Sequence, residues 1–168
     1  SGRHQFIVNC GLDGRGADDY RPLARATAGH STATVNDSSS ARFQVSARLS
    51  RIIGSPIVAG PSSVKCERTD THRTQGFVAS HDGYVSRFGV VHERELTLSG
   101  DGSVLQGADR FARSGGGNLR PGLRVDLRFH LHPDIGLFRD REDRLVLAAR
   151  DGEAWTFECR DVQADVEE

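Results

Sequence analysis

Two polar side chains at the ends of predicted strands are the first candidates for chemistry in this sequence. The short apolar run 6–8 ends at Asn9, and a second strand is predicted to begin at His30 among small residues. Although 21 positions separate them, strand ends joined by a long loop can converge in space. An amide and an imidazole in one place suit either a metal site or a site that contacts a sugar.

Residues 81–84 (His-Asp-Gly-Tyr) form a second group, and we predict a loop there because Gly83 favours a turn. His81 and Tyr84 are candidate catalytic residues, since an imidazole or a phenol can exchange protons with a substrate. The alternative is a turn beside a packed aromatic ring. His92 shares the parity of Leu96 and is predicted to be a buried, hydrogen-bonded histidine.

Residues 125–132 alternate strictly and predict one strand with an apolar face and a polar face. The polar face would carry Arg128, His130 and His132. The two histidines have a spacing that can chelate a metal, or the face can line a groove for an acidic sugar chain, or it is an ordinary solvated face. Arg25 is a further candidate for binding a carboxylate or sulfate, with a structural salt bridge as the alternative.

The composition predicts a soluble globular protein of 168 residues with a formal net charge of −1. That charge gives no case for nucleic acid or anionic membranes as partners, and no apolar run approaches a membrane span.

Lys65 is the only lysine among 22 basic residues. Arginine suits bidentate binding of anions, but codon usage in a GC-rich genome is the favoured explanation of the bias. The three scattered cysteines do not match a zinc ribbon, and Cys159 alternates with apolar residues, which predicts a core position.

Period-2 alternation broken by Gly, Asp and Ser predicts an all-β fold, an antiparallel β-sandwich of many short strands. We expect a single β domain over residues 1–168. Because the chain has no methionine, we expect it to be a fragment or an excised C-terminal domain of a longer protein.

A tight hairpin is predicted at Asp101-Gly102, a short helical turn at 21–25 and a loop at 114–118. Besides 125–132, the predicted strands include 42–49, 89–98, 145–149 and 155–159.

Five segments, taken together and in this order, resemble the C-terminal β domain of heparinase II/III-like polysaccharide lyases, and most closely their bacterial members. The similarity extends over nearly the whole chain. The segments are Phe6-Ile7-Val8-Asn9-Cys10-Gly11, Arg25-Ala26-Thr27-Ala28-Gly29-His30-Ser31-Thr32, Ser80-His81-Asp82-Gly83-Tyr84, Gly89-Val90-Val91-His92-Glu93-Arg94 and Arg128-Phe129-His130-Leu131-His132-Pro133.

The resemblance implies a zinc-linked position. Family members with a described metal site use a histidine-rich strand, an acidic residue and the histidine of an Arg-x-Thr-x-Ala-His-Asn-Thr segment. His30 matches that histidine, whereas Asn9 stands where the described sites have aspartate, and the histidine-rich strand is absent from this sequence. A neutral amide is a poor zinc ligand, so the resemblance identifies the position and argues against an intact site.

The resemblance also implies β-elimination at a uronic acid. In the family, the groups that perform most of this chemistry lie in an N-terminal helical toroid, with a further histidine from the β domain. We therefore expect the parent protein to be a lyase of the periplasm or cell envelope that acts on acidic polysaccharides such as glycosaminoglycans, and this chain alone to be inactive. Arg25, Arg128, His130 and His132 would contact the polymer. The alternative is a non-catalytic saccharide-binding domain or a structural scaffold.

Overall fold

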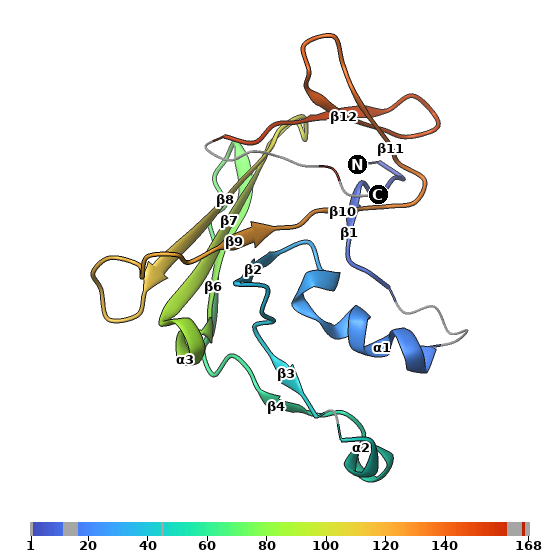
Figure 1. Cartoon of the computed structure of the whole chain (residues 1–168). Helices are drawn as coiled ribbons and strands as arrows, with labels where there is room; N and C mark the ends of the chain where they lie inside the picture. The colour runs from blue at the N-terminus through green and yellow to red at the C-terminus, as the bar shows by residue number, and fades with distance from the viewer. Residues whose placement is uncertain (1, 12–16, 45, 161–165, 167–168) are drawn as a thin grey trace. The chain divides into compact units, whose positions relative to one another are not determined.

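The structure, a computed structural model, describes residues 2–11, 17–44, 46–160 and 166 (Figure 1). Short antiparallel strands dominate and the helices are few, which confirms the all-β class. No helix in the described ranges is long and apolar enough to cross a membrane. In chain order the elements are β1 (Ile7–Val8), α1 (Ala17–Arg25), the 3-10 helix η1 (Thr27–Gly29), β2 (Ala33–Val35), β3 (Arg42–Phe43), α2 (Ala47–Ile53), β4 (Ile57–Ala59), β5 (Val64–Arg68), β6 (Thr74–Tyr84), α3 (Val85–Phe88), β7 (Val90–Ser99), β8 (Leu105–Arg113), β9 (Val125–Leu127), β10 (His130–Leu131), β11 (Gly136–Arg139), β12 (Leu145–Ala148) and β13 (Ala154–Phe157).

The chain divides into two compact units. Residues 10–128 hold a four-stranded antiparallel sheet in the order β5-β6-β7-β8 and two smaller pairs, β2-β9 and β3-β4. Residues 1–9 and 129–168 hold the three-stranded sheet β11-β12-β13 and the pair β1-β10. The sandwich arrangement and the single domain stay predictions.

The four-stranded sheet is built around the long hairpin of β7 and β8, seen side by side in Figure 1. This hairpin confirms the strand predicted at 89–98 and the turn predicted at Asp101-Gly102. The Asp101 carboxylate accepts hydrogen bonds from the hydroxyls of Ser99 and Ser103 and from the backbone N–H of Ser103. These bonds, that of the Ser99 hydroxyl foremost, lower the pKa of Asp101 to about 2. The charged turn therefore fixes the register of the hairpin.

The core of this unit forms around Tyr84, which is 0% exposed and is the largest of the fully buried side chains. Tyr84 ends β6, so the core lies where the sheet meets the β2-β9 pair. The buried members are Val35, Tyr84 and Val90, and the partly buried residues packed on them are Phe88, Phe111, Leu123 and Val125.

The strand predicted over 42–49 is wrong. Among the residues of this range that the structure describes, only Arg42–Phe43 pair as a strand, and helix α2 begins at Ala47. The apolar residues Leu49, Ile52 and Ile53 follow the i, i+3, i+4 spacing of a helix, which the strand prediction overlooked. The helical turn predicted at 21–25 is confirmed as the end of α1.

The single strand predicted over 125–132 is also wrong. It divides into β9, which pairs with β2, and β10, which pairs with β1. Alternation continues across both strands, so the pattern does not reveal the break at residues 128–129. Cys159 lies beyond the end of β13 and is exposed, which contradicts its predicted core position.

Candidate functional site

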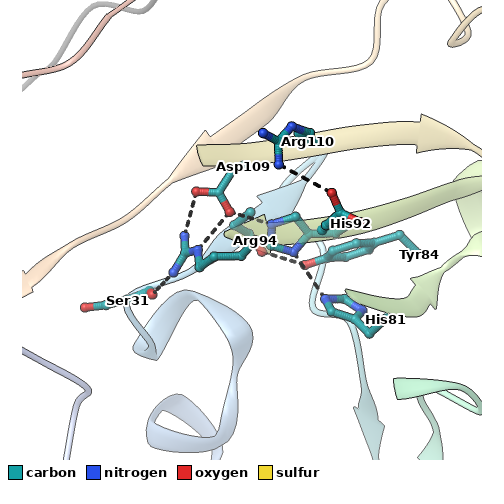
Figure 2. A network of polar contacts seen from close by, with 9 residues as sticks. Ser31, His81, Tyr84, His92, Arg94, Asp109 and Arg110 are labelled. Atoms are coloured by element: carbon teal, nitrogen blue, oxygen red, sulfur yellow. Dashed lines mark hydrogen bonds and ion pairs between the residues drawn. The ribbon is translucent and has the colours of Figure 1, made fainter. Parts of the chain in front are cut away.

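Three adjacent strands bring a set of polar side chains together on one face of the four-stranded sheet. The register places His81 of β6 opposite His92 of β7, and Arg94 of β7 opposite Asp109 of β8. Side chains of directly paired residues project from the same face, so the four groups are neighbours (Figure 2). We call His81, Tyr84, His92, Arg94 and Asp109 the sheet network.

Asp109 is the centre of this network. Its Oδ1 accepts hydrogen bonds from His92 Nε2 at 2.6 Å and from Arg94 Nε at 2.8 Å, and its Oδ2 accepts one from Arg94 Nη2 at 3.0 Å. The side chain of Asp109 is only 8% exposed and that of His92 only 4%. Arg94 uses its remaining terminal nitrogen to donate to the Ser31 carbonyl at 2.6 Å. A buried carboxylate is thus matched by a cation with several hydrogen bonds, as burial of charge requires.

The two histidines form a chain of hydrogen bonds whose direction the backbone sets. The Gly83 N–H donates to His81 Nδ1 at 3.1 Å, so the proton of a neutral His81 is on Nε2. That nitrogen lies 3.3 Å from His92 Nδ1, and His92 in turn presents Nε2–H to Asp109. A second proton on His81 would be on Nδ1, where it would face the Gly83 N–H.

The balance of burial, hydrogen bonds and neighbouring charges lowers the pKa values of both His81 and Asp109. Desolvation, together with the neighbouring His92, lowers the pKa of His81, against a smaller opposite effect of Asp82. Burial alone would raise the pKa of Asp109, but hydrogen bonds from His92 and Arg94 and the charge of Arg94 outweigh it and hold that pKa below 3.8. The network therefore combines a carboxylate with a neutral His81 at neutral pH.

Tyr84 enters the network through a bulge. The β6-β7 register shifts between His81 and Tyr84, so Tyr84 pairs with Val90 and lies on the same face as His81, with ring centroids 5.6 Å apart. Gly83 is required in this bulge, because a Cβ there would lie 2.9 Å from the Ser40 carbonyl oxygen. The loop predicted at 81–84 is thus wrong, since the bulge lets the strand continue through a glycine. Burial raises the pKa of Tyr84.

The sheet network holds the segment of residues 25–35. The Thr32 carbonyl and the Asn36 N–H form hydrogen bonds on the β9 side of β2. Because the bonding direction alternates from residue to residue in an antiparallel strand, the Ala33 carbonyl points away from β9. The Tyr84 hydroxyl donates to that carbonyl at 2.7 Å. With the bond from Arg94 to Ser31, the buried Tyr84 and the partly buried Arg94 fix the backbone immediately after His30.

The start of the same segment is held by local contacts. Arg25 donates to the Ser55 carbonyl at 2.6 Å, and its guanidinium lies 3.8 Å from the centre of the Phe43 ring. Gly29 is buried against α1, and a Cβ there would lie 2.8 Å from the Leu23 carbonyl oxygen. His30 follows directly in extended conformation and is half-buried.

The other predicted site residues do not join this network. Arg128 donates to the Thr34 hydroxyl at 2.7 Å and lies 3.8 Å from Asp37. His130 pairs with Val8 in the β1-β10 ladder. His132 accepts a hydrogen bond at Nδ1 from the Asp134 N–H. Arg128 follows the end of β9, His130 begins β10 and His132 follows it, so the three residues do not share one strand as predicted.

The sequence reasoning missed Arg94 and Asp109. Arg94 could have been found from the sequence, because it lies two positions after His92 and therefore on the same face of the predicted strand. Asp109 becomes visible only through the hairpin register, because the turn centred on Asp101-Gly102 sets Arg94 opposite it. The adjacent pair His81-Asp82 is no dyad, since Asp82 accepts from the N–H groups of Ser62 and Ser63 instead.

The side chains that the structure describes do not form a group that fits a zinc site. In the described ranges, no three side chains among His, Cys, Asp and Glu come together as a metal-binding group. Of the two residues at the family's metal-linked positions, Asn9 offers only a neutral amide. Its chain neighbour Cys10 donates its N–H to the Gly29 carbonyl at 2.8 Å, so the backbone after Asn9 lies beside the backbone before His30. Zinc binding by His30 and Asn9 stays a prediction, and no chemistry is assigned to it.

Comparison with known proteins identifies the family. The family model described as "Heparinase II/III-like, C-terminal" matches residues 1–168. No curated protein and no solved structure matches the chain. Since the match covers the whole sequence, the chain belongs to the family of heparinase II/III-like C-terminal domains.

Proposed function

We propose that this domain forms one wall of the substrate cleft in a lyase that cleaves uronate-containing polysaccharides, including sulfated ones, by β-elimination. The anchoring of residues 25–35 carries the proposal. The segment that resembles the family's histidine motif is the segment that Arg94 and Tyr84 hold to the sheet. Buried polar groups that fix one irregular segment are typical of a site whose side chains need a set geometry.

In β-elimination, a base removes the proton at C5 of the uronate, a neutralising group stabilises the charge on its carboxylate, and an acid protonates the leaving glycosidic oxygen. By the family resemblance, most of these groups come from an N-terminal helical domain of the same polypeptide. The contribution of this chain is Arg25 and His30. The guanidinium of Arg25 has five donors, so its bond to Ser55 leaves capacity for a sugar carboxylate or sulfate.

Within this proposal, His81 and Tyr84 act as positioning residues for the segment that carries His30. Arg128, His130 and His132 are further candidates for polymer contact. The proposed setting is the bacterial periplasm or cell envelope, and the proposed substrates are acidic polymers such as glycosaminoglycans or alginate.

The test is ultraviolet detection of unsaturated uronate ends when the full-length protein is mixed with heparan sulfate, alginate or bacterial exopolysaccharides. We expect activity on at least one polymer, with a clear loss for His30→Ala and Arg25→Ala. His72→Ala is the matched control, because His72 is exposed and lies outside the segment. Activity that is equal in all three variants would remove His30 and Arg25 from the cleft.

A non-catalytic role as a saccharide-binding domain or scaffold is the second candidate, and one observation favours it. Among the described residues, every buried side-chain nitrogen and oxygen has a hydrogen-bond partner. The sheet network is therefore satisfied without a substrate, as in a structural core. Polymer binding by calorimetry without any unsaturated product would support the binding role, and silence in both assays would support the scaffold.

A further inference from the structure

Strand β5 is an open edge of the four-stranded sheet. It pairs with β6 on one side, and among the described strands none pairs with its other side. All five of its residues, Val64–Arg68, are exposed, and Val64 is 70% exposed. An exposed edge strand offers a row of backbone groups to another strand.

The register shows which backbone groups face outward. The Thr69 N–H donates to the Gly76 carbonyl and the Asp82 N–H to the Ser63 carbonyl, so odd-numbered residues of β5 bond to β6. In an antiparallel ladder the direction alternates, so the N–H and C=O groups of the even-numbered residues point away from β6. The outward groups are those of Val64, Cys66 and Arg68.

The side chains of β5 are charge-complementary to a second copy of the same strand. In an antiparallel pair centred on Cys66, Lys65 of each copy stands opposite Glu67 of the other. The remaining pairs join Val64 to Arg68. The charge of Arg68 is already matched by Asp70, whose Oδ2 lies 2.6 Å from its Nη2. The paired strands therefore contain two Lys65–Glu67 charge pairs, one on each side of Cys66.

We propose that the protein forms a two-fold homodimer through antiparallel pairing of β5 with β5, centred on Cys66. A two-fold interface brings the same patch of both subunits together, so it needs a surface that complements itself, and Lys65 and Glu67 around Cys66 give one. The pairing extends a four-stranded sheet to a continuous sheet of eight strands. Because the shared edge is only five residues long, the dimer is weak, with a dissociation constant on the order of micromolar or higher.

The decisive test is a charge exchange, followed by sedimentation velocity of the full-length protein under reducing conditions. Lys65→Glu alone sets two carboxylates against each other in both cross-strand pairs, and Glu67→Lys alone sets two ammonium groups against each other. Each weakens the dimer by roughly tenfold or more, because both attractive pairs become repulsive. The double variant Lys65→Glu/Glu67→Lys restores the dimer. An equimolar mixture of the two single variants forms a heterodimer, in which one pair joins two introduced charges of opposite sign and the other joins the two original ones.

A second measurement locates the centre of the pairing. Directly opposed, hydrogen-bonded residues of antiparallel strands have Cα atoms about 5.5 Å apart, within the range that a disulfide can bridge. Diamide takes two electrons and two protons from the two Cys66 thiols, which form the S–S bond, and is itself reduced to the hydrazine. We expect a cross-linked dimer from Cys10→Ser/Cys159→Ser, which keeps Cys66 of the three cysteines in this sequence, and none when Cys66 is also replaced by serine.

Cys66→Pro provides a variant that blocks only the open edge. It removes an outward N–H while the N–H groups of residues 65 and 67 remain for β6, and proline is tolerated on such edges. We expect a folded monomer. A monomer in the unaltered protein at all concentrations overturns the proposal, and so does a dimer that survives the single charge changes and Cys66→Pro. Loss of the dimer in the double charge variant would also overturn the proposal, because its exchanged charges at positions 65 and 67 remain complementary.

Discussion

Strand β5 and the three strands beside it belong to one sheet but use polar residues in different ways. On β6–β8, Asp109, Arg94 and His92 face inward, share hydrogen bonds and are largely buried. On β5, Lys65 and Glu67 face solvent, and no described strand pairs with the outward backbone groups. A buried polar group left without its partner is costly, whereas an exposed one is hydrated, so the same change should have very different effects in the two regions.

The largest effect is expected for Asp109→Ala. Removing this carboxylate leaves Arg94 and His92 in a buried place without their shared acceptor, and we expect a loss of about 3 kcal/mol in the free energy of unfolding. Urea unfolding followed by circular dichroism measures it. Glu93→Ala, which removes an exposed partner of Arg110 on the opposite face of the sheet, is the matched control and should leave the urea midpoint unchanged. Equal effects of the two variants would contradict the expected difference between buried and exposed polar residues of the sheet.

Tyr84→Phe should have the next largest effect. The phenylalanine keeps the ring in the core, but the Ala33 carbonyl, which points away from its ladder partner, loses its donor. We expect a loss of about 1–2 kcal/mol in the free energy of unfolding. Tyr20 is 68% exposed, so Tyr20→Phe is a suitable control with no expected change. An unchanged Tyr84→Phe protein would mean that the segment after His30 is held by other contacts.

The pH dependence of stability separates His81 from the carboxylates. Because the folded pKa of His81 lies below 6.5, the unfolded chain binds its proton first, and this part of the stability declines as pH falls from 6.5 and levels off below the folded pKa. The depressed pKa of Asp109 acts lower, since that contribution persists above 3.8 and is lost as pH falls further. Urea midpoints measured across acidic and neutral pH test both windows. His81→Gln should remove the upper one, while His72→Gln, at an exposed position, should leave it.

The sequence predicted the sheet better than the site, and particular residues explain the difference. The hairpin of β7 and β8 was predictable because alternation and the Asp101-Gly102 turn agree. Pairing the two strands residue by residue outward from that turn would also have placed Arg94 opposite Asp109. His81 and Tyr84 were proposed from their side-chain chemistry, but their common face depends on the bulge at Gly83, which period-2 alternation does not reveal. Likewise, the attachment of residues 25–35 depends on contacts between segments distant in sequence.

The smallest effect is expected on β5. Lys65→Ala removes an exposed side chain from an edge strand, and its backbone bonds to β6 remain, so the free energy of unfolding of the monomer should change by no more than about 0.5 kcal/mol. Urea unfolding at a protein concentration below that of dimer formation measures it. The same change removes both Lys65–Glu67 pairs of the dimer, so association should weaken while the fold is kept. If Lys65→Ala instead lowered the stability of the monomer as much as Asp109→Ala, Lys65 would be a structural residue of the sheet and the edge would not be open.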